Sequence, residues 1–196
     1  MIVTLETGPV KYPITLNEAK KQVEIGDEQP EHDAYLNTLI AAATAQAEQY
    51  LHRRLITQTW KLYLEDWPAG DSIILPFGRL QSVTSVKYTD SDGDETTFSS
   101  ADYDVNTQNE PGLITLGYQK VWPTATLYPS NPIEIEFVCG YGAAGSSVES
   151  AIRHAIKLTI SDLFENRETE SFMPNHAKLK TWEALLFPYK LFGGVF

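Results

Sequence analysis

The residues most suggestive of chemistry in this sequence form the acidic run Asp90–Asp94. Carboxylates that alternate around a glycine are typical of a calcium-binding loop, which requires glycine at its sixth position and a bidentate glutamate at its twelfth. Counted from Asp90, those two positions hold Glu95 and Ala101. The run therefore predicts a solvated β-hairpin turn with Asp92-Gly93 at its tip, and no calcium site.

The residues that most often bind transition metals or act as nucleophiles are scattered. The histidines show no HExxH or HxH spacing, and we expect exposed helix residues at His32, His52, His154 and His176. The single cysteine, Cys139, excludes an internal disulfide and a CxxC metal site in this sequence. It ends the alternating run Ile133–Cys139 on the apolar face, so we expect a buried, unreactive thiol.

Two further patterns resemble sites without meeting their requirements. The glycine-rich stretch 140–145 lacks the Lys-Ser/Thr pair of a P-loop and the GxGxxG spacing, which predicts a flexible connection with Ser146 and Ser147 capping the next helix. Glu134 and Glu136 alternate on one strand face, as on the wet side of a sheet. No set combines a nucleophile, a base and an oxyanion donor. We therefore predict no catalytic, cofactor-binding or metal-binding residues and no enzymatic activity.

The distribution of charge limits the partners of the chain. The net charge is −11, and residues 81–140 hold nine acidic and two basic side chains. Tight nucleic-acid binding needs several Lys or Arg to neutralise phosphates, so this region should repel DNA. No segment approaches the roughly 20 apolar residues that span a bilayer, and no basic region followed by an apolar stretch opens the chain. We expect a protein that is made in the cytoplasm and stays soluble, with no membrane partner.

The spacing of apolar residues predicts an α+β fold in a single domain spanning residues 1–196. The spacing has helical periodicity over 14–54 and 148–187, and it has strand periodicity between them. We therefore expect one helical core with a β-rich insertion at 55–142, followed by a tail at 188–196.

The first helix has a clear start signal. Thr15 and Glu18 have the spacing of a capping box, and we expect Gly26 to end this helix.

The C-terminal segment is unusually apolar for a chain end. Such a segment must be covered, and two alternatives are open: it packs on its own domain, or it binds a partner. In the second alternative, four large side chains are the anchors and one lysine adds a minor electrostatic contact; these residues are Tyr189, Leu191, Phe192 and Phe196, with Lys190.

Taken in order, the segments of this chain resemble the head-tail connector, or adaptor, proteins of tailed phages and prophages. Each motif is weak alone, but their shared order is specific. The resemblance is carried by Ile14–Lys20, Tyr50–Trp60, Leu80–Tyr88, Ser100–Val105, Phe137–Gly142, Ala151–Glu168 and Phe187–Lys190.

The resemblance implies a structural role in a virus particle. It implies a cyclic homo-oligomer, dodecameric in the virion, which lies beneath the portal and joins the DNA-filled capsid to the tail. The implied partners are further copies of the chain, the portal protein and a tail or stopper protein, and double-stranded DNA passes through the lumen without sequence-specific binding. The C-terminal part would face the portal. The protein would be present in the host cytoplasm during assembly and then at the head-tail junction of the virion.

Two alternatives come from other classes. One is a tail-completion or tail-terminator ring protein of the same particle, which binds the tail tube. The other is a small hydrolase with a scattered active site. Neighbouring genes for portal, capsid and terminase would favour either ring protein over the hydrolase.

Overall fold

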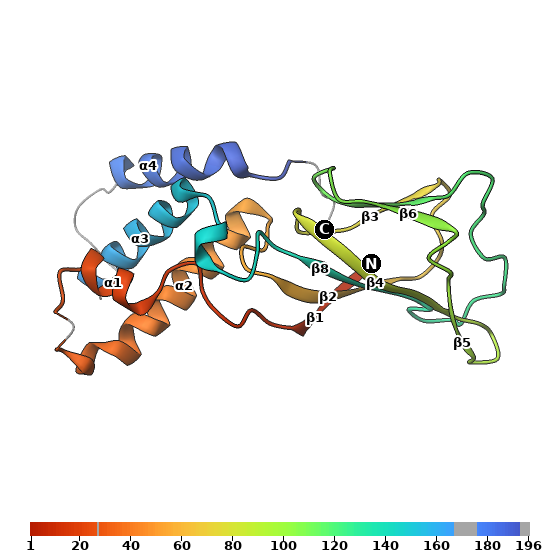
Figure 1. The fold of residues 1–196 in the computed structure, drawn as a ribbon, viewed down its shortest axis with the longest axis horizontal. Coiled ribbons are helices and arrows are strands. Elements are labelled where there is room, and N and C mark those ends of the chain that lie inside the picture. Colours follow the sequence, from red (N-terminus) through yellow and green to blue (C-terminus); the bar gives the residue numbers. More distant parts are fainter. Residues whose placement is uncertain (27, 167–175, 193–196) are drawn as a thin grey trace. The chain divides into compact units, whose positions relative to one another are not determined.

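The computed structural model describes residues 1–26, 28–166 and 176–192, with the backbone alone for 176–180. Helices and antiparallel sheets are both present, which confirms the predicted α+β class (Figure 1). The α-helices are α1 (Leu16–Gln22), α2 (Asp33–Leu51), α3 (Ser150–Glu165) and α4 (His176–Leu186). The strands are β1 (Ile2–Thr7), β2 (Gln58–Leu64), β3 (Ser72–Ile74), β4 (Leu80–Thr89), β5 (Glu95–Thr97), β6 (Tyr103–Asn106), β7 (Leu113–Leu116) and β8 (Ile133–Cys139). Short 3-10 turns lie at Pro30–His32, Gly145–Ser147 and Phe187–Tyr189.

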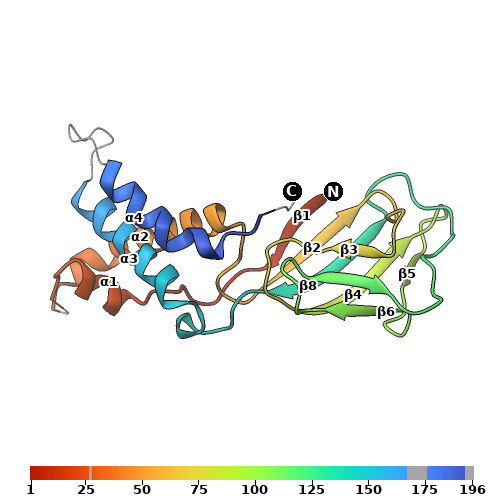
Figure 2. The same cartoon turned by 90° about the horizontal axis from the view of Figure 1, so that it is seen from above.

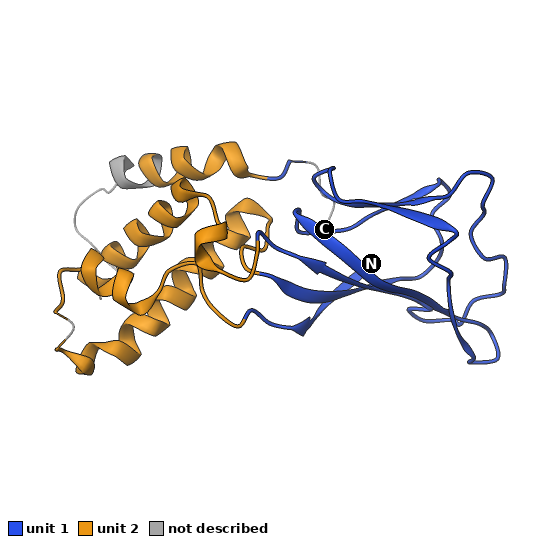
Figure 3. Cartoon of the chain, in the orientation of Figure 1, with its two compact units in different colours: residues 1–9, 57–141, 191–196 blue, residues 10–56, 142–190 orange. Residues whose placement is uncertain are grey.

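The chain divides into two compact units, coloured separately in Figure 3. The helical unit comprises Val10–Ile56 and Gly142–Lys190, and the β unit comprises Met1–Pro9, Thr57–Tyr141 and the chain from Leu191. The middle of the sequence forms strands, as its apolar pattern predicts. No sequence pattern predicted β1, which joins the β unit from the N-terminal end of the chain by pairing with β2. The organisation of both units as a single domain stays a prediction.

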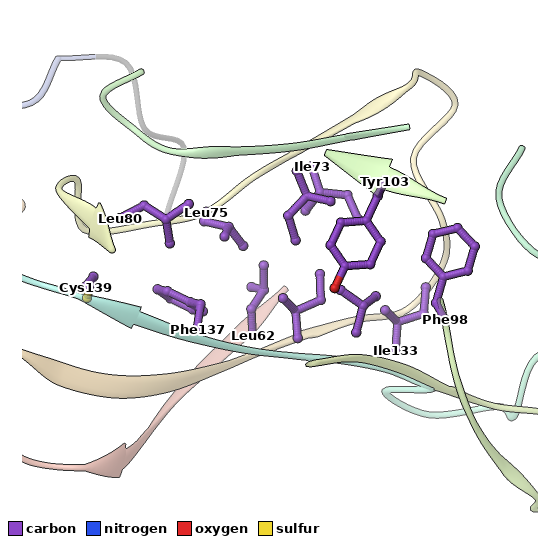
Figure 4. Close-up of a cluster of buried hydrophobic side chains, with 12 residues drawn as sticks. Leu62, Ile73, Leu75, Leu80, Phe98, Tyr103, Ile133, Phe137 and Cys139 are labelled. Carbon is purple, nitrogen blue, oxygen red and sulfur yellow. The ribbon is translucent and has the colours of Figure 1, made fainter. Parts of the chain in front are cut away.

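The β unit is built from two sheets. One has five strands in the order β1-β2-β8-β4-β5, and the other has three in the order β3-β7-β6. Along β8, buried residues alternate with half-buried ones, so a single face of this central strand meets the core. Figure 4 shows the buried side chains that both sheets contribute, among them Phe137 and Tyr103. Cys139 is buried in this cluster, as expected.

The turn between β4 and β5 confirms the hairpin predicted for the acidic run. Gly93 has a φ of +90°, a left-handed conformation that glycine adopts without steric cost. Asp90 Oδ1 accepts hydrogen bonds of 3.0 Å from the backbone N–H groups of Asp92 and Asp94. The Asp90 carboxylate therefore organises the turn itself.

The helical unit begins with the predicted capping box. Thr15 Oγ1 accepts from the backbone N–H of Glu18 at 3.3 Å, and Glu18 Oε2 accepts from the backbone N–H of Thr15 at 3.0 Å. Helix α1 ends at Gln22, earlier than expected from Gly26. Helix α2 contacts α1 and α3, and α3 contacts α4 (Figure 2).

Two local expectations in the helical unit were wrong. Ser146 and Ser147 do not cap α3, because they lie in a separate 3-10 turn and Glu149 occupies the N-cap position without a side-chain hydrogen bond. His32 is half-buried, with its ring centroid 6.0 Å from that of Phe164. His52 and His154 are exposed as expected, but His52 lies in the turn after α2 and not in a helix. The expectation for His176 concerns a side chain outside the described ones.

Candidate assembly surfaces

The predicted C-terminal anchors lie in different environments. Leu191 is 7% exposed and Phe192 is 65% exposed, although they are neighbours in sequence. Tyr189 and Lys190 are half-buried. Phe196 lies outside the described residues. The structure therefore places one predicted anchor inside the folded chain and one on its surface.

The end of helix α2 holds the backbone that precedes these anchors. Arg53 is 6% exposed, and its Nε donates a hydrogen bond to the backbone carbonyl of Tyr189. Lys190 Nζ lies 4.4 Å from the centroid of the Tyr50 ring, within the range of a cation–π contact. Both contacts lie within the helical unit, so they fix where its C-terminal segment runs.

Arg53 is positioned by an ordered turn after α2. The turn starts at His52, which has a left-handed backbone and donates its N–H to carbonyls of the last helical turn. Glu48 Oε1 accepts from the Leu55 N–H at 2.8 Å, and its Oε2 lies 3.4 Å from Arg54 Nη1. Burial raises the pKa of the Glu48 carboxyl, and the Leu55 N–H and the Arg54 guanidinium oppose that effect.

A groove of about 450 Å³ opens beside this turn. It is lined by Tyr50 of α2 together with Glu183, Ala184, Phe187 and Pro188. Phe187 is 57% exposed, and the Tyr50 and Trp182 ring centroids lie 4.9 Å apart. The sequence indicated apolar residues on each helix, but it did not indicate that Tyr50 and Phe187 line one groove.

A second exposed apolar segment precedes α1. Val10 is 91% exposed and Tyr12 is 43% exposed. The residue that follows is fixed, because the Pro13 carbonyl accepts a hydrogen bond of 3.2 Å from Arg153 Nε of α3. Arg153 also forms an ion pair with Glu18. The segment is therefore exposed but attached to an ordered support.

The β unit has few basic side chains that could attract nucleic acid. Residues 1–9 and 57–141 contain thirteen acidic and four basic side chains. Each basic side chain lies close to a carboxylate: Lys61 to Glu134 (3.3 Å), Arg79 to Glu110 (2.9 Å), Lys87 to Glu95 (2.8 Å) and Lys120 to Asp102 (2.6 Å). Phosphates would have to compete with these carboxylates, which disfavours DNA binding.

The loop between β7 and β8 exposes apolar side chains on the β unit. Tyr118 is 90% exposed and Val121 is 73% exposed. Further along, Trp122 stacks on Trp67 with ring centroids 4.9 Å apart and an interplanar angle of 9°. The exposed tip is therefore attached to a packed aromatic base.

The described residues contain neither a cluster of metal ligands nor a helix that could span a membrane. No cluster of three or more His, Cys, Asp or Glu side chains that could hold a metal ion occurs among them. Within the same residues, none of the helices has both the length and the apolar character needed to cross a bilayer.

Comparison with solved structures shows a shared fold. The chain is 23% identical to a chain in the neck of an empty gene transfer agent particle computed with C6 symmetry, with a TM-score of 0.80 and 99% of both chains covered. It is 22% identical to a chain from the neck of the native particle computed with C12 symmetry, with a TM-score of 0.77 and 99% of both chains covered. Among curated proteins, none matches this chain.

The family comparison covers more than half of the sequence. The family model for phage gp6-like head-tail connector proteins matches residues 13–117, which include α1, α2 and most strands of the β unit. The chain therefore belongs to the phage gp6-like head-tail connector family, as a structural subunit and not as an enzyme.

Proposed function

We propose that this chain forms a cyclic homo-oligomer, a dodecamer in the virion, which lies beneath the portal and joins the DNA-filled capsid to the tail. The observation that carries the proposal is the family match over residues 13–117, supported by a fold shared along 99% of the chain with neck proteins of gene transfer agent particles. A dodecamer is consistent with the C12 symmetry used for one of those necks. The protein would assemble from the host cytoplasm onto the head and remain at the head-tail junction.

The portal contact is the segment around the C-terminal anchors. Phe192 is 65% exposed and would insert into the portal, as an aromatic anchor at an interface does. Leu191 is buried in the single chain, so its contribution is to fix the direction from which Phe192 projects. Tyr189 and Lys190, which belong to the helical unit, complete the contact, and Phe196 is the remaining proposed anchor. Repetition around a ring would let modest contacts hold the joint through avidity.

The lumen would let double-stranded DNA slide through without binding it. Each basic side chain of the β unit is paired with a carboxylate, so few of them are available to contact DNA phosphates. The attraction between this unit and DNA would therefore be weak and non-specific, which favours this role. The remaining partner, a tail or stopper protein, would meet loops of the β unit such as the one carrying Tyr118 and Val121.

The test compares two neighbouring substitutions in the full chain. Purified protein is added to DNA-filled heads that carry portals but lack connectors, and the heads that acquire the protein and then join tails are counted by electron microscopy. Phe192→Ala should leave the melting temperature unchanged and weaken head binding, because an anchor is worth about 2 kcal/mol per copy. Leu191→Ala should instead lower the melting temperature. Heads that never bind the unmodified chain would contradict the proposed function, and an unaffected Phe192→Ala variant would contradict the portal contact.

A further inference from the structure

We infer that adjacent copies contact each other through two different surfaces of the helical unit. Residues Val10–Tyr12 of one copy would enter the groove of the next copy, against Tyr50, Glu183 and Phe187. This inference rests on the proposed ring and names the contact that closes it.

The groove has apolar walls and one carboxylate. Tyr50 is held in place by Trp182 and by Lys190, so that wall is ordered before any partner arrives. Glu183 is exposed at the edge of the groove and forms no ion pair with any residue in the described parts of the chain. The groove therefore suits an apolar segment that carries a positive charge.

The segment Val10–Tyr12 has this composition. Its two apolar residues flank Lys11, which is exposed and forms no ion pair within residues 1–26, 28–166 and 176–192. Pro13 holds the segment through the Arg153 hydrogen bond. Gly145 permits this close approach, because a Cβ atom there would lie 2.4 Å from the Pro13 carbonyl oxygen.

Charge and position both favour a second copy as the occupant. The net charge of −11 makes copies repel each other, so a contact between Lys11 and Glu183 would offset part of that repulsion. In Figure 1 the chain leading into α1 passes below α3, whereas α4 runs along the upper side of the helical unit, above α3. Surfaces on opposite sides of one unit make a heterologous contact, which closes into a ring when the rotation permits.

Cysteine pairing tests the contact in the full chain. In a Cys139→Ala background, one variant carries Lys11→Cys and another carries Glu183→Cys. Under mild oxidation, the mixture should give a disulfide-linked dimer on a non-reducing gel, whereas each variant alone should give little, since a heterologous contact keeps identical positions apart. A Tyr118→Cys variant mixed with Glu183→Cys is the matched control and should remain unlinked, because its cysteine is equally exposed but lies outside the segment Val10–Tyr12.

Charge exchange provides an independent readout. Lys11→Glu and Glu183→Lys should each weaken association about five-fold, measured by analytical ultracentrifugation, and combining them should restore it. Melting temperatures should stay unchanged, since both side chains are exposed. If the unmodified chain forms rings and neither the disulfide nor the rescue appears, the contact is wrong while the proposed function stands. If the unmodified chain forms no ring, alone or on portal-bearing heads, the proposed function and the contact both fail.

Discussion

Arg53 Nε donates a hydrogen bond to the backbone carbonyl of Tyr189, a residue 136 positions further along the chain. The guanidinium is almost fully buried, so water cannot replace this hydrogen bond without opening the structure. The contact joins the turn after α2 to the turn after α4. It therefore connects the position of the proposed portal anchors to the folding of the N-terminal helices.

Replacing Arg53 by Ala should lower the free energy of unfolding by about 2 kcal/mol, because a buried charge-assisted hydrogen bond is lost and the Tyr189 carbonyl is left without that donor. Urea denaturation measures the change. Arg79→Ala is the matched control: its side chain is 48% exposed and pairs with Glu110 at the surface, so the cost should stay below about 1 kcal/mol. Equal effects of the two substitutions would contradict the structural role of Arg53.

Glu18 should stabilise the fold at neutral pH and lose that contribution in acid. Burial raises its pKa, but hydrogen bonds from Thr15 and the nearby Arg153 outweigh burial and hold the pKa below 4.5. A carboxyl with a lowered pKa in the folded state contributes stability above its unfolded pKa, and this is lost as pH falls through the folded pKa. Glu18→Gln keeps the geometry of the capping box but removes the charge that pairs with Arg153, so it should cost about 0.5–1 kcal/mol at neutral pH and less at about pH 3. Thermal unfolding of the unmodified chain and of the Glu18→Gln variant between neutral pH and about pH 3 measures whether their stabilities converge in acid.

Glu48 should show the opposite dependence on pH. Burial raises its pKa above 4.5, so the folded state binds its proton more tightly than the unfolded state does. As pH rises from the unfolded pKa through the folded pKa, this group therefore reduces stability. Glu48→Gln removes the titration, so the variant should gain stability relative to the unmodified chain as pH rises through that window. A stability difference between Glu48→Gln and the unmodified chain that does not change with pH would contradict the raised pKa of Glu48.

Phe137 should be a principal determinant of stability in the β unit. Its side chain is fully buried on β8, so Phe137→Ala should cost about 3–5 kcal/mol through lost burial and the cavity left behind. Tyr118→Ala removes an aromatic ring that is 90% exposed and should change stability by less than about 0.5 kcal/mol. Chemical denaturation of the two variants compares these costs. A small loss for Phe137→Ala would mean that the sheets do not enclose this residue.

Local signals in the sequence predicted those parts of the fold that local interactions determine. The capping box at Thr15 and Glu18 involves residues three positions apart, and the Asp92-Gly93 turn is organised by Asp90 nearby. Strand β8 shows its alternation because one of its faces is fully buried. Strand β1 gave no such signal, because none of its residues is fully buried and its strand pairing depends on β2, far along the chain.

The assembly surfaces were only partly predictable for the same reason. Composition alone indicated that the C-terminal segment must be covered or bound, but it did not distinguish buried Leu191 from exposed Phe192. The groove needs Tyr50 from α2 and Phe187 after α4, which no short-range pattern joins. The prediction that Ser146 and Ser147 cap α3 was wrong because a 3-10 turn competes with the helix start for the same residues.

The discontinuous make-up of the two units sets an order of events during synthesis. Both sheets of the β unit are complete in sequence once Cys139 has been made, and every strand, including β1, is then available to pair. The helical unit must still wait for α3 and α4. Because domains generally fold as units while the ribosome is still adding residues, the β unit should fold first and the first two helices should remain without their partners meanwhile. The groove needs residues 183–188, so a nascent chain that stops at the β unit cannot capture a neighbouring subunit prematurely.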